Sequence, residues 1–135
     1  MHNHCTKQAD CCHNYCEANH FCYSAQCVRT TELLAEQLGL DKDKFTTCFQ
    51  SRLGPTKWVE PYTSDILKKR AELGEKRLLC VCPAFVADCL ETIIEIGEEY
   101  QEEFEEMGGE VVQLVHSLNA DDDWVTAMKQ IIHDA

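Results

Sequence analysis

The chain has 135 residues and a mass of 15.4 kDa, enough for one domain with one hydrophobic core. Its 24 acidic and 12 basic side chains give a formal net charge of -12, which repels nucleic-acid phosphates and anionic membrane surfaces and favours cations. No apolar stretch approaches the ~20 residues of a membrane span and no secretory signal is visible, so we expect a cytoplasmic protein. Because the cytosol keeps thiols reduced, the ten cysteines do not indicate disulfides.

The first 27 residues hold six of the ten cysteines and four histidines. Thiolates bind zinc and iron strongly, so residues 1–27 are predicted to be a metal-binding or iron–sulfur segment. An α/β domain is expected to follow over residues 28–135. The six cysteines are Cys5, Cys11, Cys12, Cys16, Cys22 and Cys27.

The first half of the domain is predicted to hold a helix and a strand. Leucines at helical spacing indicate a helix over 28–40, with Gly39 as its stop. Residues 45–51 are rich in β-branched and aromatic side chains, which favours a strand. Two prolines are expected to keep residues 52–62 out of regular structure.

Beyond residue 62 the pattern alternates between helical spacing and short apolar runs. The run over 77–82 is uninterrupted, as in a strand covered on both faces, which favours a parallel sheet. With right-handed crossovers, the order of elements predicts an α/β fold: a parallel sheet with helices on both faces. Three strands make a thin sheet, so we expect an exposed edge or a missing partner half. The elements are a helix capped by Thr63 or Ser64 with Asp65 in its first turn and Gly74 beyond its end, a strand over 77–82, a helix over 86–107, a strand over 111–118 and a helix from Asp121 onward.

The helix predicted over 86–107 is strongly acidic, with nine carboxylates and no basic side chain between Asp88 and Glu106. Glu91, Glu95 and Glu99 are four residues apart and are predicted to share one face. Like charges at this spacing destabilise a helix by a few tenths of a kcal/mol each, so the column indicates a cation or a proton to be handled. The remaining glutamates are interpreted as a solvated face. The residues expected toward the core are Val86, Leu90, Ile93, Ile94, Gly97, Tyr100 and Phe104.

Two acidic positions lie near the predicted start of this helix. Asp88 and Glu91 follow a predicted buried strand, at the edge of the sheet where open α/β folds bind ligands. Cys48, Cys80 and Cys82 fall on predicted strands and are expected to be small core residues.

Three stretches carry a specific pattern: residues 49–61, which contain Gln50-Ser-Arg-Leu-Gly-Pro-Thr-Lys-Trp58; residues 76–92, continuing through Glu95 to Tyr100; and Leu118-Asn119, followed by an acidic turn and the terminal helix. Together they resemble the carboxyl-terminal half of ferrochelatases, lyases that insert ferrous iron into a porphyrin to make haem. The resemblance runs from about Cys22 to the last residue. It implies one half of a chelatase-type two-domain fold.

The resemblance implies roles for particular residues. Glu91 matches the glutamate in the metal-handling part of the porphyrin cleft. Glu95 and Glu99, with Asp88, match an acidic path for metal entry or proton exit. Trp58 matches an aromatic residue that lines the porphyrin pocket, the alternative being a loop tryptophan that plugs the core. The implied substrates are Fe(II) and protoporphyrin IX or coproporphyrin III.

The chain also departs from the family pattern. The family's principal catalytic histidine lies in a short motif that is not found here, and Cys89 stands where many members have histidine. We therefore expect the chain alone to be inactive and to need an N-terminal half or a homo-oligomeric partner. The alternatives are a small homodimeric tetrapyrrole chelatase and a non-enzymatic iron–sulfur module or remnant.

The cysteine-rich start resembles an insertion found in some bacterial ferrochelatases, which implies a [2Fe–2S] cluster on four thiolates. The adjacent Cys11 and Cys12 do not easily both bind with relaxed geometry, which leaves Cys27 as a candidate fourth ligand. Zinc and unligated thiols are the alternatives. The candidate ligands are Cys5, Cys11, Cys12, Cys22 and Cys27.

Overall fold

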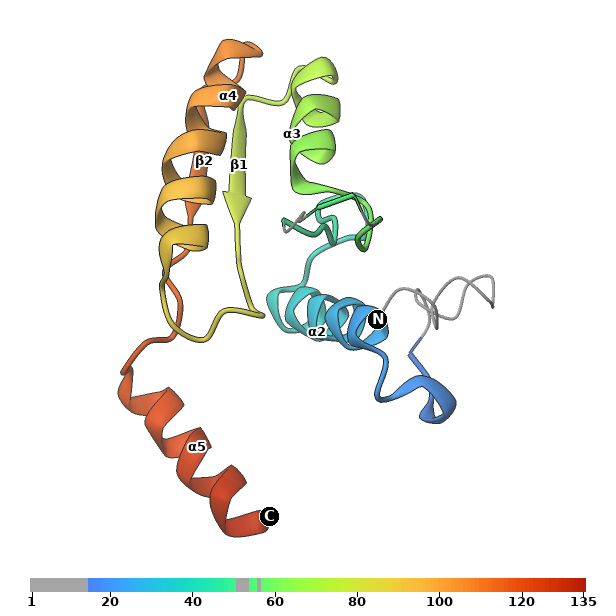
Figure 1. Ribbon diagram of the computed structural model, residues 1–135, viewed down its shortest axis with the longest axis vertical. Helices are drawn as coiled ribbons and strands as arrows, with labels where there is room; N and C mark the ends of the chain where they lie inside the picture. The colour runs from blue at the N-terminus through green and yellow to red at the C-terminus, as the bar shows by residue number, and fades with distance from the viewer. Residues whose placement is uncertain (1–14, 51–53, 56) are drawn as a thin grey trace. The chain divides into compact units, whose positions relative to one another are not determined.

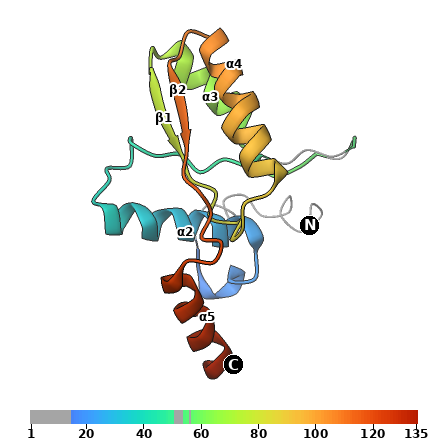
Figure 2. The same ribbon diagram turned by 90° about the vertical axis from the view of Figure 1, so that its left-hand side faces the viewer.

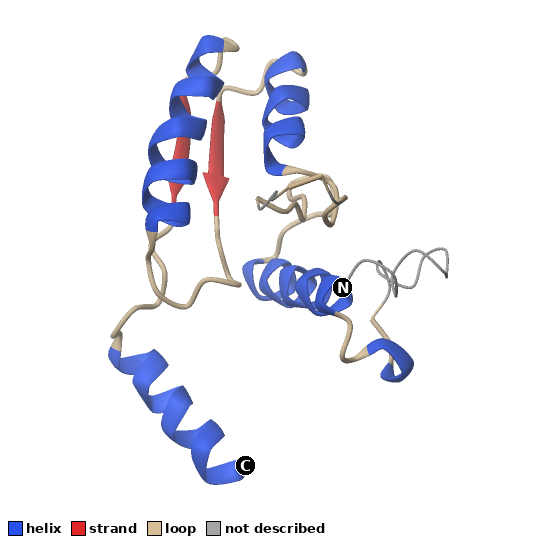
Figure 3. Ribbon diagram, viewed as in Figure 1, coloured by secondary structure: helices blue, strands red, loops and turns tan. Residues whose placement is uncertain are grey.

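The computed structural model describes residues 15–50, 54–55 and 57–135. The chain divides into two compact units, one whose described residues end at Ile66 and one formed by Leu67–Ala135, and each is treated by itself. The predicted boundary between residues 27 and 28 falls inside a helix of the first unit. Figure 3 shows the helices and strands along the chain.

The first unit begins with a 3-10 turn, η1 (Glu17–Asn19), followed by helix α2 (Tyr23–Leu38). The helix starts at Tyr23 rather than at residue 28, because the backbone of Cys22 is extended and the helical conformation begins directly after it. Its end is as predicted: Gly39 has a φ of 65° and donates its N–H to carbonyls of the last turn.

The strand predicted over 45–51 is wrong for its described residues. Only an isolated parallel bridge joins Phe49 to Tyr62. The N–H of Phe49 donates to the Pro61 carbonyl at 2.9 Å, and the N–H of Thr63 donates to the Phe49 carbonyl at 3.0 Å. The neighbouring segment contains Pro61, which has no N–H to donate to a ladder, so the favourable composition of 45–51 does not produce a strand.

Helix α3 (Thr63–Glu72) follows at once and has the predicted ends. Asp65 lies in its first turn, where a negative charge interacts favourably with the helix dipole. Beyond the last turn, Gly74 has a φ of 80° and donates its N–H to the Ala71 carbonyl at 2.9 Å. Gly74 therefore lies beyond the end of the helix as predicted, and the helix starts within one residue of the predicted cap.

The second unit contains a parallel sheet of two strands, β1 (Arg77–Cys80) and β2 (Val111–Leu114), paired from Arg77 with Val111 to Cys80 with Leu114. Both strands are shorter than predicted. Leu79 is 68% exposed whereas Leu78 is half-buried, so the described residues cover β1 on one face. The mixed helix–strand fold with a parallel sheet is confirmed, and helices on both faces stay a prediction.

One continuous helix, made of η2 (Glu91–Glu99) and α4 (Tyr100–Glu106), packs along β2 (Figures 1 and 2). Cys80 and Cys82 are half-buried against the core that forms there, as expected of small core residues. The helix stops at Gly108, whose φ is 91°. The buried residues of this core are Leu67, Ile96, Tyr100, Phe104 and Val112.

The start of this helix differs from the prediction over 86–107. Val86 and Asp88 lie in the loop before it, because the carboxylate of Asp88 accepts hydrogen bonds from the loop that follows β2 instead of capping a turn of its own. The helix therefore starts only after Asp88, whose carboxylate is bonded to the loop that follows β2.

The first part of the helix, η2, is a π-helix: the N–H of Tyr100 bonds to the carbonyl of Glu95, five residues back. The buried face is therefore not the one predicted. Leu90 is 76% exposed, and Thr92 and Ile96 are buried in its place. Ile93, Ile94 and Val86 are exposed as well, whereas Tyr100 and Phe104 are buried as predicted.

Helix α5 (Asp122–Asp134) begins after Asp121, as the acidic turn predicts. Its apolar stripe is exposed from Val125 to Ile132. Among the residues that the structure describes, no helix has the length and hydropathy that crossing a bilayer requires.

Candidate functional site

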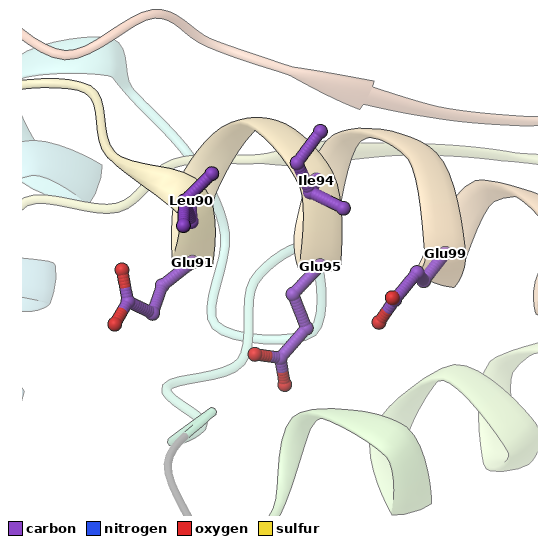
Figure 4. A pocket seen from close by; sticks show the side chains of 5 residues that line it. All are labelled: Leu90, Glu91, Ile94, Glu95 and Glu99. Carbon is purple, nitrogen blue, oxygen red and sulfur yellow. The ribbon is translucent and has the colours of Figure 1, made fainter.

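The acidic column lies on one face of η2, as the four-residue spacing predicts. Glu91, Glu95 and Glu99, together with Leu90 and Ile94, line an open hollow with a volume of about 310 Å³. In Figure 4 the three carboxylates project from successive turns on the same side of the helix. Because each turn of a π-helix contains more residues than an α-turn, side chains four apart stay close to one line.

The three carboxylates differ in their surroundings. Glu91 is exposed, and its pKa is lowered mainly by a hydrogen bond with the Cys89 thiol and also by its own backbone N–H. Glu95 is half-buried and accepts a hydrogen bond from the Tyr100 hydroxyl at 3.2 Å. Glu99 is exposed. Glu91 is therefore firmly ionised at neutral pH.

The column is a series of single carboxylates. Within the described part of the chain, no three histidine, cysteine, aspartate or glutamate side chains lie close enough together to hold one metal ion.

Asp88 does not line the hollow with them. Its Oδ1 accepts the N–H of Ser117 at 3.0 Å, and its Oδ2 accepts the side-chain amide of Asn119 at 2.8 Å. These bonds, the one with Asn119 first, lower the pKa of Asp88 to about 2. His116 Nδ1 lies 3.5 Å from the Asp88 Oδ2 and lowers the pKa further.

The sequence did not indicate the hydrogen-bonding roles of three residues of this region, Thr92, Ser117 and Asn119, although Thr92 and Asn119 belong to the stretches that carry the resemblance. Thr92 is fully buried, and its Oγ1 accepts the N–H of Cys89 at 3.0 Å, which caps the start of the helix. Asn119 has a φ of 50°, a conformation that asparagine adopts more readily than most residues. An asparagine directly after a strand was the available signal.

Trp58 belongs to the first unit and lies in the irregular segment predicted over 52–62. The segment has a left-handed Gly54 and a cis Glu60–Pro61 peptide. The hydroxyl of Tyr62 donates to the Trp58 carbonyl at 3.5 Å. Trp58 is 37% exposed, which argues against a tryptophan that plugs the core.

The cysteine-rich segment is described only in part, because Cys5, Cys11 and Cys12 lie outside the described residues. Cys22 and Cys27 are half-buried thiols at the start of α2. Burial raises the pKa of Cys27, a hydrogen bond with Tyr23 lowers it in part, and charge on Cys22 raises it.

A tyrosine neighbours this thiol pair. Tyr23 is hydrogen-bonded to Cys27, and burial, followed by this bond, raises the pKa of Tyr23 to about 12. Cys16, the remaining cysteine of the segment within the described residues, is an exposed thiol.

Open α/β folds bind their ligands beyond the carboxyl ends of the strands, and this unit presents its column of carboxylates on the helix that follows β1. The sequence profile described as Ferrochelatase matches residues 3–135. The chain therefore belongs to the ferrochelatase family, as its motifs predict.

Known ferrochelatases show the same relationship. That of Ectopseudomonas mendocina (strain ymp) is 50% identical over 133 residues, and that of Pseudomonas fluorescens (strain Pf0-1) is 49% identical over 134 residues. The ferrochelatase of Stutzerimonas stutzeri (strain A1501) is 50% identical over 129 residues. The alignments cover 98%, 98% and 95% of this chain but only 39%, 39% and 38% of the relatives. The chain thus spans about two fifths of the length of the curated relatives it matches.

Proposed function

We propose that the chain is the carboxyl-terminal portion of a ferrochelatase, which inserts Fe(II) into a porphyrin to make haem. The observation that carries the proposal is the column of carboxylates on η2, headed by an ionised Glu91. Membership of the ferrochelatase family and about 50% identity to ferrochelatases support it.

The reaction needs a carboxylate in this position. When Fe(II) enters the macrocycle, two pyrrole N–H protons leave and the ion sheds its water ligands. Carboxylate oxygens can hold and release a divalent ion, and a carboxylate near the macrocycle accepts a proton. The lowered pKa of Glu91 means that a proton it accepts passes on readily. In this proposal Glu95 and Glu99 carry the ion inward or protons outward.

The porphyrin would need a rigid wall as well. We propose Trp58 for it, because the residue is partly exposed and lies in a segment set by a glycine and two prolines. An indole ring stacks well on a flat aromatic ligand. The substrate in this proposal is protoporphyrin IX or coproporphyrin III.

We also propose a [2Fe–2S] cluster at the start of the chain. The chemistry of the described residues fits: two free, half-buried thiols lie at the start of the same helix, Cys22 at the N-cap of α2 and Cys27 within α2. Cys5, Cys11 and Cys12 are the other proposed ligands. A cluster would supply four iron–thiolate bonds that tie the segment to α2. The elevated pKa of Cys27 means that metal must displace a proton from this thiol.

At the level of the whole protein, the proposal is a two-domain chelatase of which this chain is one half. Helices on both faces of the sheet and a cytoplasmic location belong to it. The missing half is either an N-terminal ferrochelatase half or a second copy of this chain.

The test uses a chimera in which this chain replaces the matching segment of the Ectopseudomonas mendocina ferrochelatase. Glu91→Gln keeps the size of the side chain and removes its charge, so metal insertion should fall by about 10²–10⁴-fold, the usual worth of a general acid or base. Glu103→Gln on the exposed face of α4 is the matched control and should leave the rate unchanged. Near-wild-type insertion by Glu91→Gln would mean that the column is a solvated face.

A further inference from the structure

Asp88 and Asn119, 31 residues apart, are bonded to each other in both directions. The side-chain amide of Asn119 donates to Asp88 Oδ2 at 2.8 Å. The backbone N–H of Asp88 donates in return to the Asn119 Oδ1 at 2.9 Å. Reciprocal bonding of this kind fixes both side chains and both backbones at once.

Further bonds extend the pair into a junction between two loops. The other oxygen of Asp88 accepts the Ser117 N–H at 3.0 Å, and the N–H of Asn119 donates to the Val86 carbonyl at 2.8 Å. The amide of Asn119 also reaches the Ser117 carbonyl at 3.0 Å. The loop that leads into η2 is therefore fastened to the loop that leaves β2.

The same junction fixes the position of the backbone at Glu91. Thr92 Oγ1 accepts the N–H of Cys89 at 3.0 Å and lies 3.4 Å from Asp88 Oδ1. The backbone is thus held on both sides of Glu91, whose own side chain is exposed. An exposed glutamate side chain has several rotamers, so the region that its carboxylate can occupy is set mainly by the position of its backbone.

We propose that Asp88 and Asn119 form a positioning clamp, which sets the start of η2 and thereby the place of the carboxylate of Glu91. In this view Asp88 acts through Glu91 and is not itself on the metal path. The inference rests on the proposed function for the meaning of Glu91, whereas the clamp itself rests on the bonds described above.

The surroundings of Asp88 favour a clamp over a ligand. Its side chain is 14% exposed, and both of its oxygens already accept bonds from the loop after β2. A ligand would have to give up these bonds for each ion. The imidazole of His116, which is 84% exposed, lies beside the same oxygen as the amide of Asn119.

The experiment compares four forms of the full chain: wild type, Asp88→Asn, Asn119→Asp and the reversed pair that carries both substitutions. Asp88→Asn places two amide donors against each other, and Asn119→Asp places two carboxylates against each other. The reversed pair restores both bonds between the residues, and it lacks the bond to the Ser117 carbonyl and the carboxylate beside His116. Glu103→Gln is the control.

The first measurement is hydrogen exchange of the backbone amides of Ser117 and Cys89. Each single substitution should speed exchange by about 10–100-fold, the worth of a hydrogen bond to a charged group. In the Asn119→Asp background, adding Asp88→Asn should slow exchange again by about tenfold. Wild-type exchange in both single variants, or no slowing in the reversed pair, would overturn the clamp.

The second measurement is metal insertion by the same four forms of the chimera. A clamp predicts the same reversal of sign: Asp88→Asn lowers the rate alone and raises it in the Asn119→Asp background. If the carboxylate at 88 were itself a ligand, Asp88→Asn would lower the rate in both backgrounds, and the proposal would be wrong. The proposed function is tested separately: if the Glu91→Gln chimera kept its activity, the proposed function would be wrong, whatever the four forms show about the clamp.

Discussion

The ring of Phe104 lies directly against the Cα of Gly109. The two residues are also joined by the backbone, since the N–H of Gly109 donates to the Phe104 carbonyl at 2.8 Å. A Cβ on Gly109 would overlap three ring atoms of Phe104, a side chain that is fully buried. The turn from α4 to β2 is thus closed by a contact that only glycine permits.

Gly109→Ala should therefore destabilise the protein severely. A fully buried ring has no room to move, so the loss should reach or exceed the ~1–3 kcal/mol typical of overpacked cores. Gly108→Ala is the matched control: its φ is 91° but nothing lies within 4 Å of the added Cβ, so only the ~1–2 kcal/mol of left-handed backbone strain applies. Urea unfolding followed by circular dichroism measures both, and equal losses would contradict the contact.

The clamp should make stability depend on pH in the acid range. The pKa of Asp88 is lowered to about 2 by Asn119 and Ser117, below the ~3.9 of an unfolded aspartate. Its contribution is thus fully present above pH ~5 and is lost as the pH falls toward 2. Asn119→Gly keeps the left-handed backbone and removes the main cause of the shift.

Urea unfolding at pH 7, 4 and 2.5 should therefore show a difference between wild type and Asn119→Gly that shrinks with acid. His116 remains in both proteins and so does not create this difference. A difference of the same size at all three pH values would contradict the lowered pKa.

Anaerobic reconstitution with iron and sulfide should give a red-brown protein with the visible absorption of a [2Fe–2S] centre. Cys22→Ser should bleach it, because this thiol is a proposed ligand at the start of α2. Cys80→Ser, which alters a thiol packed against the core, should keep the colour. A colourless protein that holds stoichiometric zinc would reject the cluster and keep the site.

The chain alone should insert no metal into porphyrin above the uncatalysed rate, because it spans about two fifths of the length of active relatives. Addition of the part of the Ectopseudomonas mendocina ferrochelatase that this chain does not match should restore some insertion. Fluorescence loss of the free porphyrin measures both. Rapid turnover by the chain alone would favour the homodimeric chelatase.

The sequence predicted helix ends best where capping chemistry is local. Gly39 and Gly74 end their helices in left-handed conformations, and Thr63 begins α3 as predicted. The family was predicted as well, because its motifs are long and specific. These features depend on residues that are close together in the chain.

Features that depend on distant residues were missed. Residues 45–50 have the composition of a strand, but a ladder also needs a partner, and Phe49 finds only a single bridge. Asp88 was assigned to a helix because its bonds to Ser117 and Asn119 lie about 30 residues away along the chain. The π-helix was hidden too, since a four-residue spacing fits α- and π-turns alike.

The helix from Glu91 to Glu106 carries eight glutamates and no basic side chain, so its charges repel one another when it folds. Dissolved ions weaken this repulsion over a Debye length of ~30 Å at 0.01 M salt and ~10 Å at 0.1 M. Unfolding spreads the charges apart, so screening favours the folded helix. Ionic strength therefore sets how firmly the protein holds the surface that carries Glu91.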